Sequence, residues 1–506
     1  MKPIIRFYKI ILTILSSLLL FTCFFLYLSQ QWLMTYYKGI SMQEIAFHLR
    51  MPLKGTSSEL TKSFFALVIK PLILPFLLFL ALYFLSQFWQ VIVINKKDNK
   101  EWNISKLFLK FKKIIIWPFA IIVLLLSIDS LIINFRLDKY ILSNLSKTDI
   151  YKKEYIDPSK IKFDFPEKKR NLVFIILESM ESTFFQKDYG GYYNEDLISE
   201  LRTLAKDNIH FTNTNLLGGA AQVAGTGWTV GALVAHTLGI PLILPIHGNN
   251  YEGYNKFLPG AYGLTDILAS AGYQQRFLIG SDKRFAGRDT LFETHGNVLI
   301  KDINYYKANG KIPQNYHVWW GFEDEKLYNL AKEELLDLAS QPEPFNLMLL
   351  TVDTHHVGGY VCRLCKNEFD LQYKNVLACA SKQVSSFVSW IQSQEWYENT
   401  TIVIVGDHLY MDGTFVPYGA DRRTYNVYIN SQVQPKRTNF REFSTLDTFP
   451  SILDSLGVKY QEPGLALGRS LFRDSLTLLE KYGLQVLNEE LPKNCKEYNY
   501  FLYYKR

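Results

Sequence analysis

Three long apolar runs lie near the start of the chain. Each has few charged residues and is long enough to cross the hydrocarbon core of a bilayer as a helix. The runs are Ile10 to Leu28, Pro71 to Asn95 and Ile114 to Ile133. The first could also be the core of a signal peptide, but no small-residue cleavage site follows it, so we expect a retained anchor. The pattern predicts a helical membrane domain over residues 1–134 with about three transmembrane helices.

The charge of the loops predicts how this membrane domain is oriented. Lysines crowd the stretch from Lys96 to Lys113, between the second and third runs, against only Asp98 and Glu101. Positively charged loops stay on the cytoplasmic side of a membrane. We therefore expect this loop inside the cell and everything after residue 134 outside it.

Beyond residue 168, short β-branched runs alternate with amphipathic stretches. Short apolar runs bounded by polar residues predict buried parallel strands, and apolar positions three and four apart predict helices. The expected strands include Leu172 to Leu177, Phe345 to Val352 and Thr401 to Val405, and the expected helices include Asp324 to Ser340 and Ser381 to Glu395. This alternation predicts an α/β sandwich with a mostly parallel central sheet over residues 168–475.

Two further segments flank the predicted sandwich. Residues 135–167 are polar and carry Pro158 and Pro166, so we expect a linker near the membrane surface. Residues 476–506 are expected to form a C-terminal tail rich in tyrosine, to which the pattern assigns no role. At 506 residues and 48% hydrophobic composition, the chain is too long for one ordinary domain. The net charge of +7 comes partly from the lysine-rich loop, so we expect no nucleic acid partner.

Polar side chains that suit a metal ion follow two of the expected strands. Glu178 comes directly after Leu177, and Asp407 and His408 follow the run that ends at Val405. The carboxyl ends of parallel strands line the ligand crevice of an open α/β sheet, so these side chains are expected to meet. Carboxylates and an imidazole are ligands for a divalent cation. The alternative is a helix-capping Asp and a surface His.

A hydroxyl group is expected beside these three side chains. Gly225-Thr226-Gly227-Trp228-Thr229 precedes a small and apolar run, Val230 to Ala235, that can begin a helix. Glycines let the backbone approach a ligand closely, and a helix N-terminus favours a phosphate. A threonine hydroxyl is a poor nucleophile unless a cation stabilises its alkoxide. Thr229 is the predicted metal ligand and nucleophile, with Thr226 as the alternative and Trp228 as a further candidate site residue.

The order of four motifs resembles that of a known family. The motifs are Leu177-Glu178-Ser179, Gly-Thr-Gly-Trp-Thr229, Thr-Val-Asp-Thr-His355-His356 and Val-Gly-Asp407-His408. They are similar to those of the membrane phosphoglycerol transferases of the alkaline phosphatase and sulfatase superfamily, which include phosphoglycerol transferase I and lipoteichoic acid synthase. The resemblance runs from about Asn171 to about Phe472 and implies an alkaline-phosphatase/sulfatase-like sandwich. It also implies a multi-pass protein of the bacterial cytoplasmic membrane, with its catalytic domain on the outer or periplasmic face.

The resemblance implies roles for individual residues. Glu178, Thr229, Asp407 and His408 would hold one divalent metal ion, with Mn²⁺ preferred and Mg²⁺ or Zn²⁺ as alternatives, and Thr229 would be the nucleophile. Arg288 and His355 would bind the substrate, with His356 as a weaker match. The donor would be phosphatidylglycerol from the membrane bilayer, and the acceptor would be a hydroxyl of a glycan or polyol. Diacylglycerol would leave.

Other functions stay open at this point. A phosphoethanolamine transferase has the same superfamily core and a threonine nucleophile. Transfer to water would make the protein a phosphodiesterase, and a vestigial site would leave a membrane-anchored protein that binds a glycan or a lipid. Sulfate ester hydrolysis is disfavoured, because the sequence lacks the Cys-x-Pro-x-Arg segment of sulfatases.

Three of the five cysteines lie close together in the part of the chain expected outside the membrane. They are Cys362, Cys365 and Cys379. Thiols outside the cytoplasm are usually paired, so we expect a structural disulfide among them, with zinc binding as the alternative. The pairing stays open, and Cys495 could take part.

Overall fold

The computed structural model describes residues 2–37, 39–51, 58–73, 76–77, 92–95, 100–103, 117–244, 256–412, 415–416 and 419–503. The chain forms two compact units. The first comprises Met1–Ile40 and Ser57–Asp138, and the second comprises Ser41–Thr56 and Lys139–Arg506.

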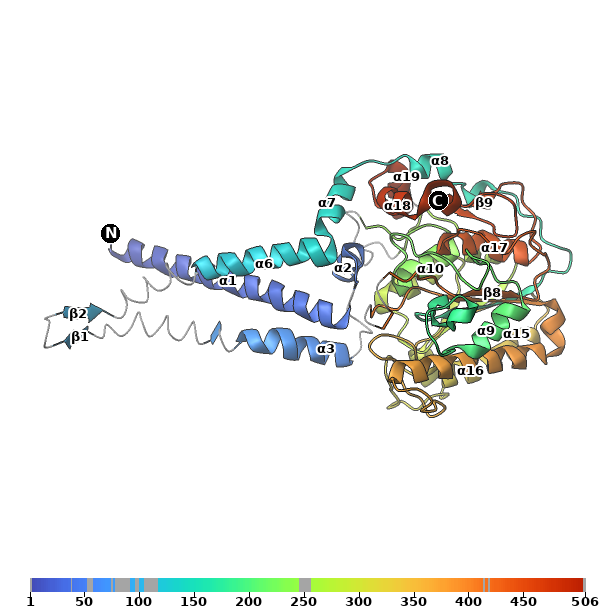
Figure 1. The fold of residues 1–506 in the computed structure, drawn as a ribbon, viewed down its shortest axis with the longest axis horizontal. Coiled ribbons are helices and arrows are strands. Elements are labelled where there is room, and N and C mark those ends of the chain that lie inside the picture. The colour runs from blue at the N-terminus through green and yellow to red at the C-terminus, as the bar shows by residue number, and fades with distance from the viewer. Residues whose placement is uncertain are drawn as a thin grey trace. The chain divides into compact units, whose positions relative to one another are not determined.

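The first unit contains long helices and one hairpin (Figure 1). Its helices are α1 (Lys2–Tyr36), α3 (Ser58–Phe64), which continues as the π-helical turn η1 (Phe65–Ile69), and α6 (Trp117–Phe135). The strands β1 (Ile92–Asn95) and β2 (Lys100–Asn103) pair antiparallel. The indole of Trp32 in α1 donates a hydrogen bond of 3.0 Å to the hydroxyl of Ser63 in α3, which ties these two helices together.

The three predicted membrane spans lie within the residues of this unit. Ile10 to Leu28 lies within α1, most of Ile114 to Ile133 lies within α6, and most of Pro71 to Asn95 lies outside the described residues. The prediction of a helix is wrong for the end of the second run, where the backbone pairs with β2 and forms β1. Among the residues that the structure describes, no helix combines the length and the apolar character that a membrane crossing needs. The membrane domain therefore stays a prediction.

The second unit is built around a sheet with the strand order β5-β4-β6-β3-β7-β8. Its strands are β3 (Asn171–Leu177), β4 (Gln274–Ile279), β5 (Leu299–Lys301), β6 (Phe345–Leu350), β7 (Thr400–Gly406) and β8 (Asn426–Ile429). All neighbours pair in parallel except β8, which runs antiparallel to β7. The prediction of a mostly parallel central sheet is confirmed, and the three predicted strands are β3, β6 and β7.

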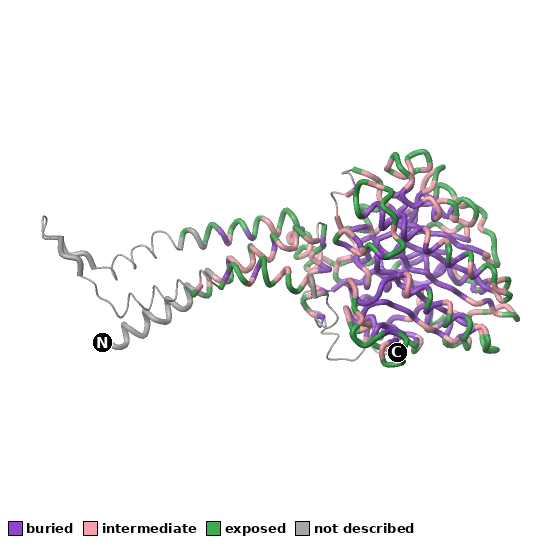
Figure 2. Tube along the Cα trace, turned by 90° about the horizontal axis from the view of Figure 1, so that it is seen from below, coloured by how far each residue is buried: buried purple, intermediate pink, exposed green. Residues whose placement is uncertain are grey.

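Helices cover both faces of this sheet (Figure 1). Successive side chains of a strand point to opposite faces, so Phe174 of β3 lies in one core and Ile175 in the other. Helices of the first core are α10 (Thr229–Leu238), α12 (Leu264–Ser270), α13 (Arg288–Thr294) and α17 (Thr448–Ser455). Helices of the second core are α9 (Ser199–Asp207), α15 (Asp324–Ala339) and α16 (Gln372–Gln392). Figure 2 shows the buried chain running through the middle of this unit and the exposed chain around it.

Shorter elements connect the layers. The short helices and strands are α2 (Met42–His48), α7 (Leu137–Leu145), α8 (Ile150–Glu154), α14 (Ile303–Ala308), β9 (Gly464–Leu465), β10 (Gly468–Arg469), α18 (Leu478–Glu490) and α19 (Lys496–Tyr503). The 3₁₀ turns are η3 (Pro158–Lys160), η4 (Ser182–Phe184), η5 (Lys187–Tyr189), η6 (Phe285–Gly287), η7 (Glu395–Asn399) and η8 (Thr445–Asp447).

One predicted helix has different limits in the structure. The helix expected at Ser381 to Glu395 is α16, which begins at Gln372 and ends at Gln392. It starts earlier because Val376 and Leu377 continue the buried face toward the N-terminus.

Parts of the predicted linker and of the predicted tail pack against the second unit. Tyr151 of α8 is buried, and its hydroxyl donates a hydrogen bond of 2.8 Å to the carbonyl of Leu491. Leu487, Leu491 and Tyr498 of the tail are buried in the same core as α10. The hydroxyl of Tyr498 accepts a hydrogen bond of 2.6 Å from the amide of Ile243 and donates one of 2.8 Å to the carbonyl of Pro241. These bonds fix the chain that leaves α10.

Tyr498→Phe should lower the free energy of unfolding by about 1–3 kcal/mol, because the buried amide of Ile243 loses its acceptor. Thermal or denaturant unfolding of the full-length protein in detergent measures this loss. Tyr192→Phe is the matched control, because Tyr192 is exposed and its substitution should change little. An unchanged midpoint for Tyr498→Phe would show that water replaces the hydroxyl.

Candidate functional site

The sheet brings Glu178 and Asp407 together at one edge. β3 and β7 are neighbours, and Leu177 lies opposite Gly406 in their register, so the residues that follow both strands are adjacent. The amide of Asp407 donates a hydrogen bond of 3.0 Å to the carbonyl of Leu177. A side chain at Gly406 would place its Cβ 1.9 Å from the carbonyl oxygen of Met180. Only glycine therefore allows these two strand ends to approach so closely.

Four predicted site residues meet at this edge. One ligand atom from each of Glu178, Asp407 and His408 lies within 4.8 Å of the others, and all three side chains are buried. Thr229 is the first residue of α10, and its Oγ1 lies 3.5 Å from Oε2 of Glu178 and 3.5 Å from Nε2 of His408. We call this group the acidic centre.

A strained turn at Ser179 couples the two carboxylates of the acidic centre. Ser179 has φ +52°, a left-handed conformation that is uncommon for residues other than glycine. Its amide donates a hydrogen bond of 2.7 Å to Oδ1 of Asp407, and its hydroxyl donates one of 2.8 Å to Oε1 of Glu178. The sequence showed Ser179 only as part of a motif, and nothing in the pattern revealed this role. Strain at such a position is typical of functional sites.

The strand on the other side of β3 fixes the backbone of Glu178. Its amide donates a hydrogen bond of 2.9 Å to the hydroxyl of Thr351, and its carbonyl accepts one of 2.5 Å from the hydroxyl of Thr354. Both threonines follow β6. The sequence showed both threonines only as part of the motif that ends at His355-His356, and nothing in the pattern revealed this role.

The acidic centre concentrates negative charge away from water. Burial, and after it the carboxylate of Glu178, raise the pKa of Asp407 to about 7, although His408 opposes this shift. Burial disfavours the charged form of His408, but the carboxylates of Asp407 and Glu178 outweigh burial and raise its pKa. Oδ2 of Asp407 is buried and has no hydrogen-bond partner among the described residues. Such an oxygen needs a positive charge nearby.

The orientation of His408 fits a cation at this point. Its Nδ1 lies 2.9 Å from the carbonyl of Leu409, which can only accept, so Nδ1 carries the proton. Nε2 lies 3.4 Å from both Oδ2 of Asp407 and Oε1 of Glu178, so when Nε2 is deprotonated its lone pair lies beside these two oxygens. These three acceptors repel one another unless a positive charge lies among them. Oxygen and nitrogen donors of this kind suit a divalent metal ion.

The two candidate threonines have different surroundings. Thr226 is fully buried; its hydroxyl donates to the carbonyl of Val223 at 2.9 Å and accepts from the amide of Val223 at 3.2 Å. It therefore closes the turn before α10, while Thr229 faces the acidic centre. Trp228 is also buried, and its indole nitrogen has no hydrogen-bond partner within the described part of the chain.

Arg288 and His355 lie near the acidic centre. Burial lowers the pKa of Arg288, and the carboxylates of Asp282 and Glu178 oppose that shift; the resulting pKa of about 10 leaves Arg288 charged at neutral pH. Its guanidinium donates to the carbonyls of Phe285 at 3.1 Å and Asp282 at 2.7 Å. Burial lowers the pKa of His355, and Glu178 opposes that shift.

His356 has a different environment from His355. The His356 ring lies 5.6 Å from that of Tyr410, whereas the His355 ring lies 4.7 Å from that of Trp320. The structure brings His355 into electrostatic contact with Glu178.

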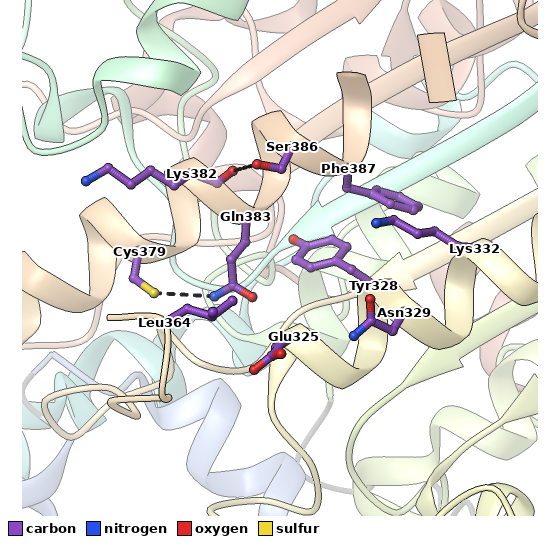
Figure 3. A pocket seen from close by; sticks show the side chains of 10 residues that line it. All are labelled: Glu325, Tyr328, Asn329, Lys332, Leu364, Cys379, Lys382, Gln383, Ser386 and Phe387. Atoms are coloured by element: carbon purple, nitrogen blue, oxygen red, sulfur yellow. Dashed lines mark hydrogen bonds between the residues drawn. The ribbon is translucent and has the colours of Figure 1, made fainter. Parts of the chain in front are cut away.

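The three cysteines of the predicted disulfide gather away from the acidic centre. Sγ of Cys362 lies 3.7 Å from those of Cys365 and Cys379, so all three are free thiols. The side-chain amide of Gln383 donates to Cys379 at 3.5 Å (Figure 3). A cavity of about 190 Å³ between α15 and α16 adjoins Cys379 and Gln383. The disulfide stays a prediction.

Asp407→Asn should lower the affinity for a divalent metal ion by more than about a hundredfold, since it removes a charge while keeping the shape of a buried ligand. Elemental analysis of purified full-length protein and titration with Mn²⁺ measure the change. Glu293→Gln, at an exposed carboxylate, is the control and should leave metal content unchanged. Equal metal content in both variants would place the ion elsewhere.

Protein exported to an oxidising compartment should contain one disulfide from Cys362 to either Cys365 or Cys379, because both sulfur atoms are within reach after small movements. Alkylation without reduction, followed by peptide mass analysis, identifies the pair and leaves the third cysteine alkylated. Cys495→Ser should not alter the pattern. Three alkylated thiols, or one bound zinc ion per chain at this cluster, would contradict the disulfide.

Several solved structures share the fold of the second unit. A protein of that superfamily from Vibrio parahaemolyticus is 20% identical with a TM-score of 0.50, over 67% of this chain and 78% of that one. The lipoteichoic acid synthase LtaP from Listeria monocytogenes is 16% identical with a TM-score of 0.50, over 64% and 80%. The integral membrane protein lipooligosaccharide phosphoethanolamine transferase A (EptA) from Neisseria meningitidis is 14% identical with a TM-score of 0.50, over 88% and 84%. These similarities confirm the predicted fold of the second unit.

Comparisons of the sequence also identify relatives of this chain. Phosphoglycerol transferase I from Shigella flexneri and from Escherichia coli are each 32% identical to this chain over 324 residues, which is 62% of the chain. The match spans about 40% of the length of these curated relatives. The profile of the Sulfatase family matches residues 170–458, which contain every residue of the acidic centre. The chain therefore belongs to the sulfatase family.

Proposed function

We propose that the protein is a metal-dependent phosphotransferase that moves phosphoglycerol from phosphatidylglycerol to a hydroxyl of an extracytoplasmic glycan or polyol. The observation that carries this proposal is the hydroxyl of Thr229, 3.5 Å from Glu178 and 3.5 Å from His408. A nucleophile beside metal ligands at a helix N-terminus suits phosphoryl transfer. The names of the relatives, phosphoglycerol transferase I and lipoteichoic acid synthase, support the same chemistry.

Glu178, Asp407, His408 and Thr229 would hold the metal ion, with Mn²⁺ proposed and Mg²⁺ or Zn²⁺ as alternatives. When bound, a divalent ion stabilises the alkoxide of a hydroxyl and neutralises charge on a phosphate. The unpartnered oxygen of Asp407 and the lone pair of His408 are the observations that fit it.

The residues of the chain have defined tasks in the proposed reaction. The Thr229 hydroxyl donates toward Oε2 of Glu178, which takes up its proton. The Oγ1–P bond forms as the P–O bond to diacylglycerol breaks, and the leaving oxygen takes a proton from water. Amide groups at the start of α10 stabilise the phosphate charge. An acceptor hydroxyl then attacks the phosphorus and gives its proton to water, while the Oγ1–P bond breaks and Thr229 recovers the proton held by Glu178.

Arg288 and His355 are proposed to bind the donor. Arg288 is a buried cation close enough to Glu178 to interact with it electrostatically, so its guanidinium can bind a phosphate oxygen beside the acidic centre. A membrane location with the second unit on the periplasmic face would give this site access to a lipid donor without ATP.

Thr229→Ala should abolish covalent labelling and the release of diacylglycerol, because the attacking oxygen is lost. Detergent-solubilised protein incubated with head-group-labelled phosphatidylglycerol and Mn²⁺ provides the assay, and peptide mass analysis locates the label. Thr226→Ser is the matched control: it keeps the hydroxyl that closes the turn and should still be labelled at residue 229.

Three results would contradict parts of this proposal. Label in Thr229→Ala would move the nucleophile elsewhere. Reaction with phosphatidylethanolamine instead of phosphatidylglycerol would make the protein a phosphoethanolamine transferase. If neither lipid labelled the protein or released diacylglycerol, a binding protein without activity would be favoured.

A further inference from the structure

The side chain of Gln222 connects two loops of the acidic centre. Gln222 lies in the loop that leads to Thr229, and its Oε1 accepts a hydrogen bond of 2.9 Å from the amide of Leu409, the residue after His408. Among the residues that the structure describes, this is the only hydrogen bond between residues 222–228 and residues 407–410. It therefore joins the segment before the nucleophile to the segment of two predicted metal ligands.

Gly227 provides the space in which the carboxamide of Gln222 lies. A Cβ added at Gly227 would stand 2.6 Å from Nε2, 3.1 Å from Cδ and 3.6 Å from Oε1 of Gln222, and these are the three atoms nearest to it. The carboxamide therefore occupies the place that a side chain at residue 227 would take, two residues before Thr229. Any side chain there would displace it.

The backbone of Gln222 is held on both sides. The amide of Ala221 donates a hydrogen bond of 2.8 Å to the carbonyl of Phe443, and the amide of Val223 donates one of 3.2 Å to the hydroxyl of Thr226. The side chain of Gln222 thus extends from a fixed point, so its carboxamide can transmit the position of one loop to the other.

Leu409 passes this constraint on to His408. The carbonyl of Leu409 accepts a hydrogen bond of 2.9 Å from Nδ1 of His408, while its amide donates to Gln222. Both polar backbone groups of Leu409 are thus engaged, one with the imidazole and the other with the carboxamide. Partners that orient a metal-binding histidine from behind matter for metal affinity, because they set the direction of its free nitrogen.

We propose that Gln222 is a positioning residue that sets the geometry between Thr229 and His408. This inference rests on the proposed function. Oε1 of Gln222 fixes Leu409 and, through it, the imidazole that binds the metal ion. The carboxamide packs at the same time on the turn before Thr229. One side chain thus keeps the nucleophile beside the metal ligands.

The test uses three variants of the full-length protein and titration with Mn²⁺. Gln222→Met keeps the length of the side chain but removes the acceptor, so the affinity for Mn²⁺ should fall about tenfold or more. Gly227→Ala displaces the carboxamide without removing its polar groups and should have the same effect. Gln222→Glu keeps an acceptor for the amide of Leu409 and should bind Mn²⁺ at least as tightly as wild type.

Hydrogen exchange of the metal-free protein gives a readout that needs neither metal nor donor. The segment 407–410 should exchange faster in Gln222→Met and in Gly227→Ala than in wild type, because the amide of Leu409 loses its acceptor. Gln222→Glu should keep the protection. Gln392→Met, at an exposed glutamine of α16, is the matched control and should change neither exchange nor Mn²⁺ affinity.

Kinetics separate positioning from donor binding. With saturating Mn²⁺, Gln222→Met should lower kcat for phosphatidylglycerol about tenfold and leave KM unchanged, because Gln222 orients site residues and does not hold the lipid.

Four results would overturn the positioning role. They are wild-type exchange of the segment 407–410 in Gln222→Met, wild-type Mn²⁺ affinity in that variant, an equal loss in Gln222→Glu, and a rise in KM without a fall in kcat. A wild-type protein that binds no divalent ion and releases no diacylglycerol would refute the proposed function instead. The exchange experiment would then still decide whether Gln222 holds the loop of His408.

Discussion

The buried charge of the acidic centre is the constraint on which this site depends. Two carboxylates and the lone pair of an imidazole meet within 4.8 Å, out of contact with water. Such a group is unstable unless a positive charge compensates it, because charge that leaves water loses its hydration. A cation bound there, as proposed above, would also face the hydroxyl of Thr229. The residues of the acidic centre would thus bind the cation that their own stability requires and that the proposed reaction uses.

The surrounding structure holds these charges in place with backbone groups and hydroxyls. Ser179 adopts a strained conformation that directs its amide to Asp407 and its hydroxyl to Glu178. Gly406 lets the ends of β3 and β7 approach closely enough for that contact. The strain is sustained because β7 is buried along its whole length and β3 is buried everywhere except at Asn171. Rigid strands thus fix a turn that could not hold this geometry alone.

A short helix from the N-terminal part of the chain, outside the sulfatase-family region, packs beside the site. The family match begins at residue 170, whereas α2 lies at residues 42–48. Through Phe47 and His48 this helix packs against Trp228 and Phe285, which lie beside Thr229 and Arg288.

The sequence by itself determined the central strands and the acids that follow them. β-branched runs bounded by polar residues are a local signal, and β3, β6 and β7 lie where those runs predicted. The signal that placed Thr229 just before a helix of small residues was also local in the sequence. Only the tertiary structure separated Thr229 from Thr226, whose hydroxyl closes a turn.

The contact of Ser179 with Asp407 and the docking of α2 also emerged only in the folded chain. Contacts of this kind join residues far apart in sequence. Periodicity reports which face of an element is buried, but it does not report which distant residue meets that face.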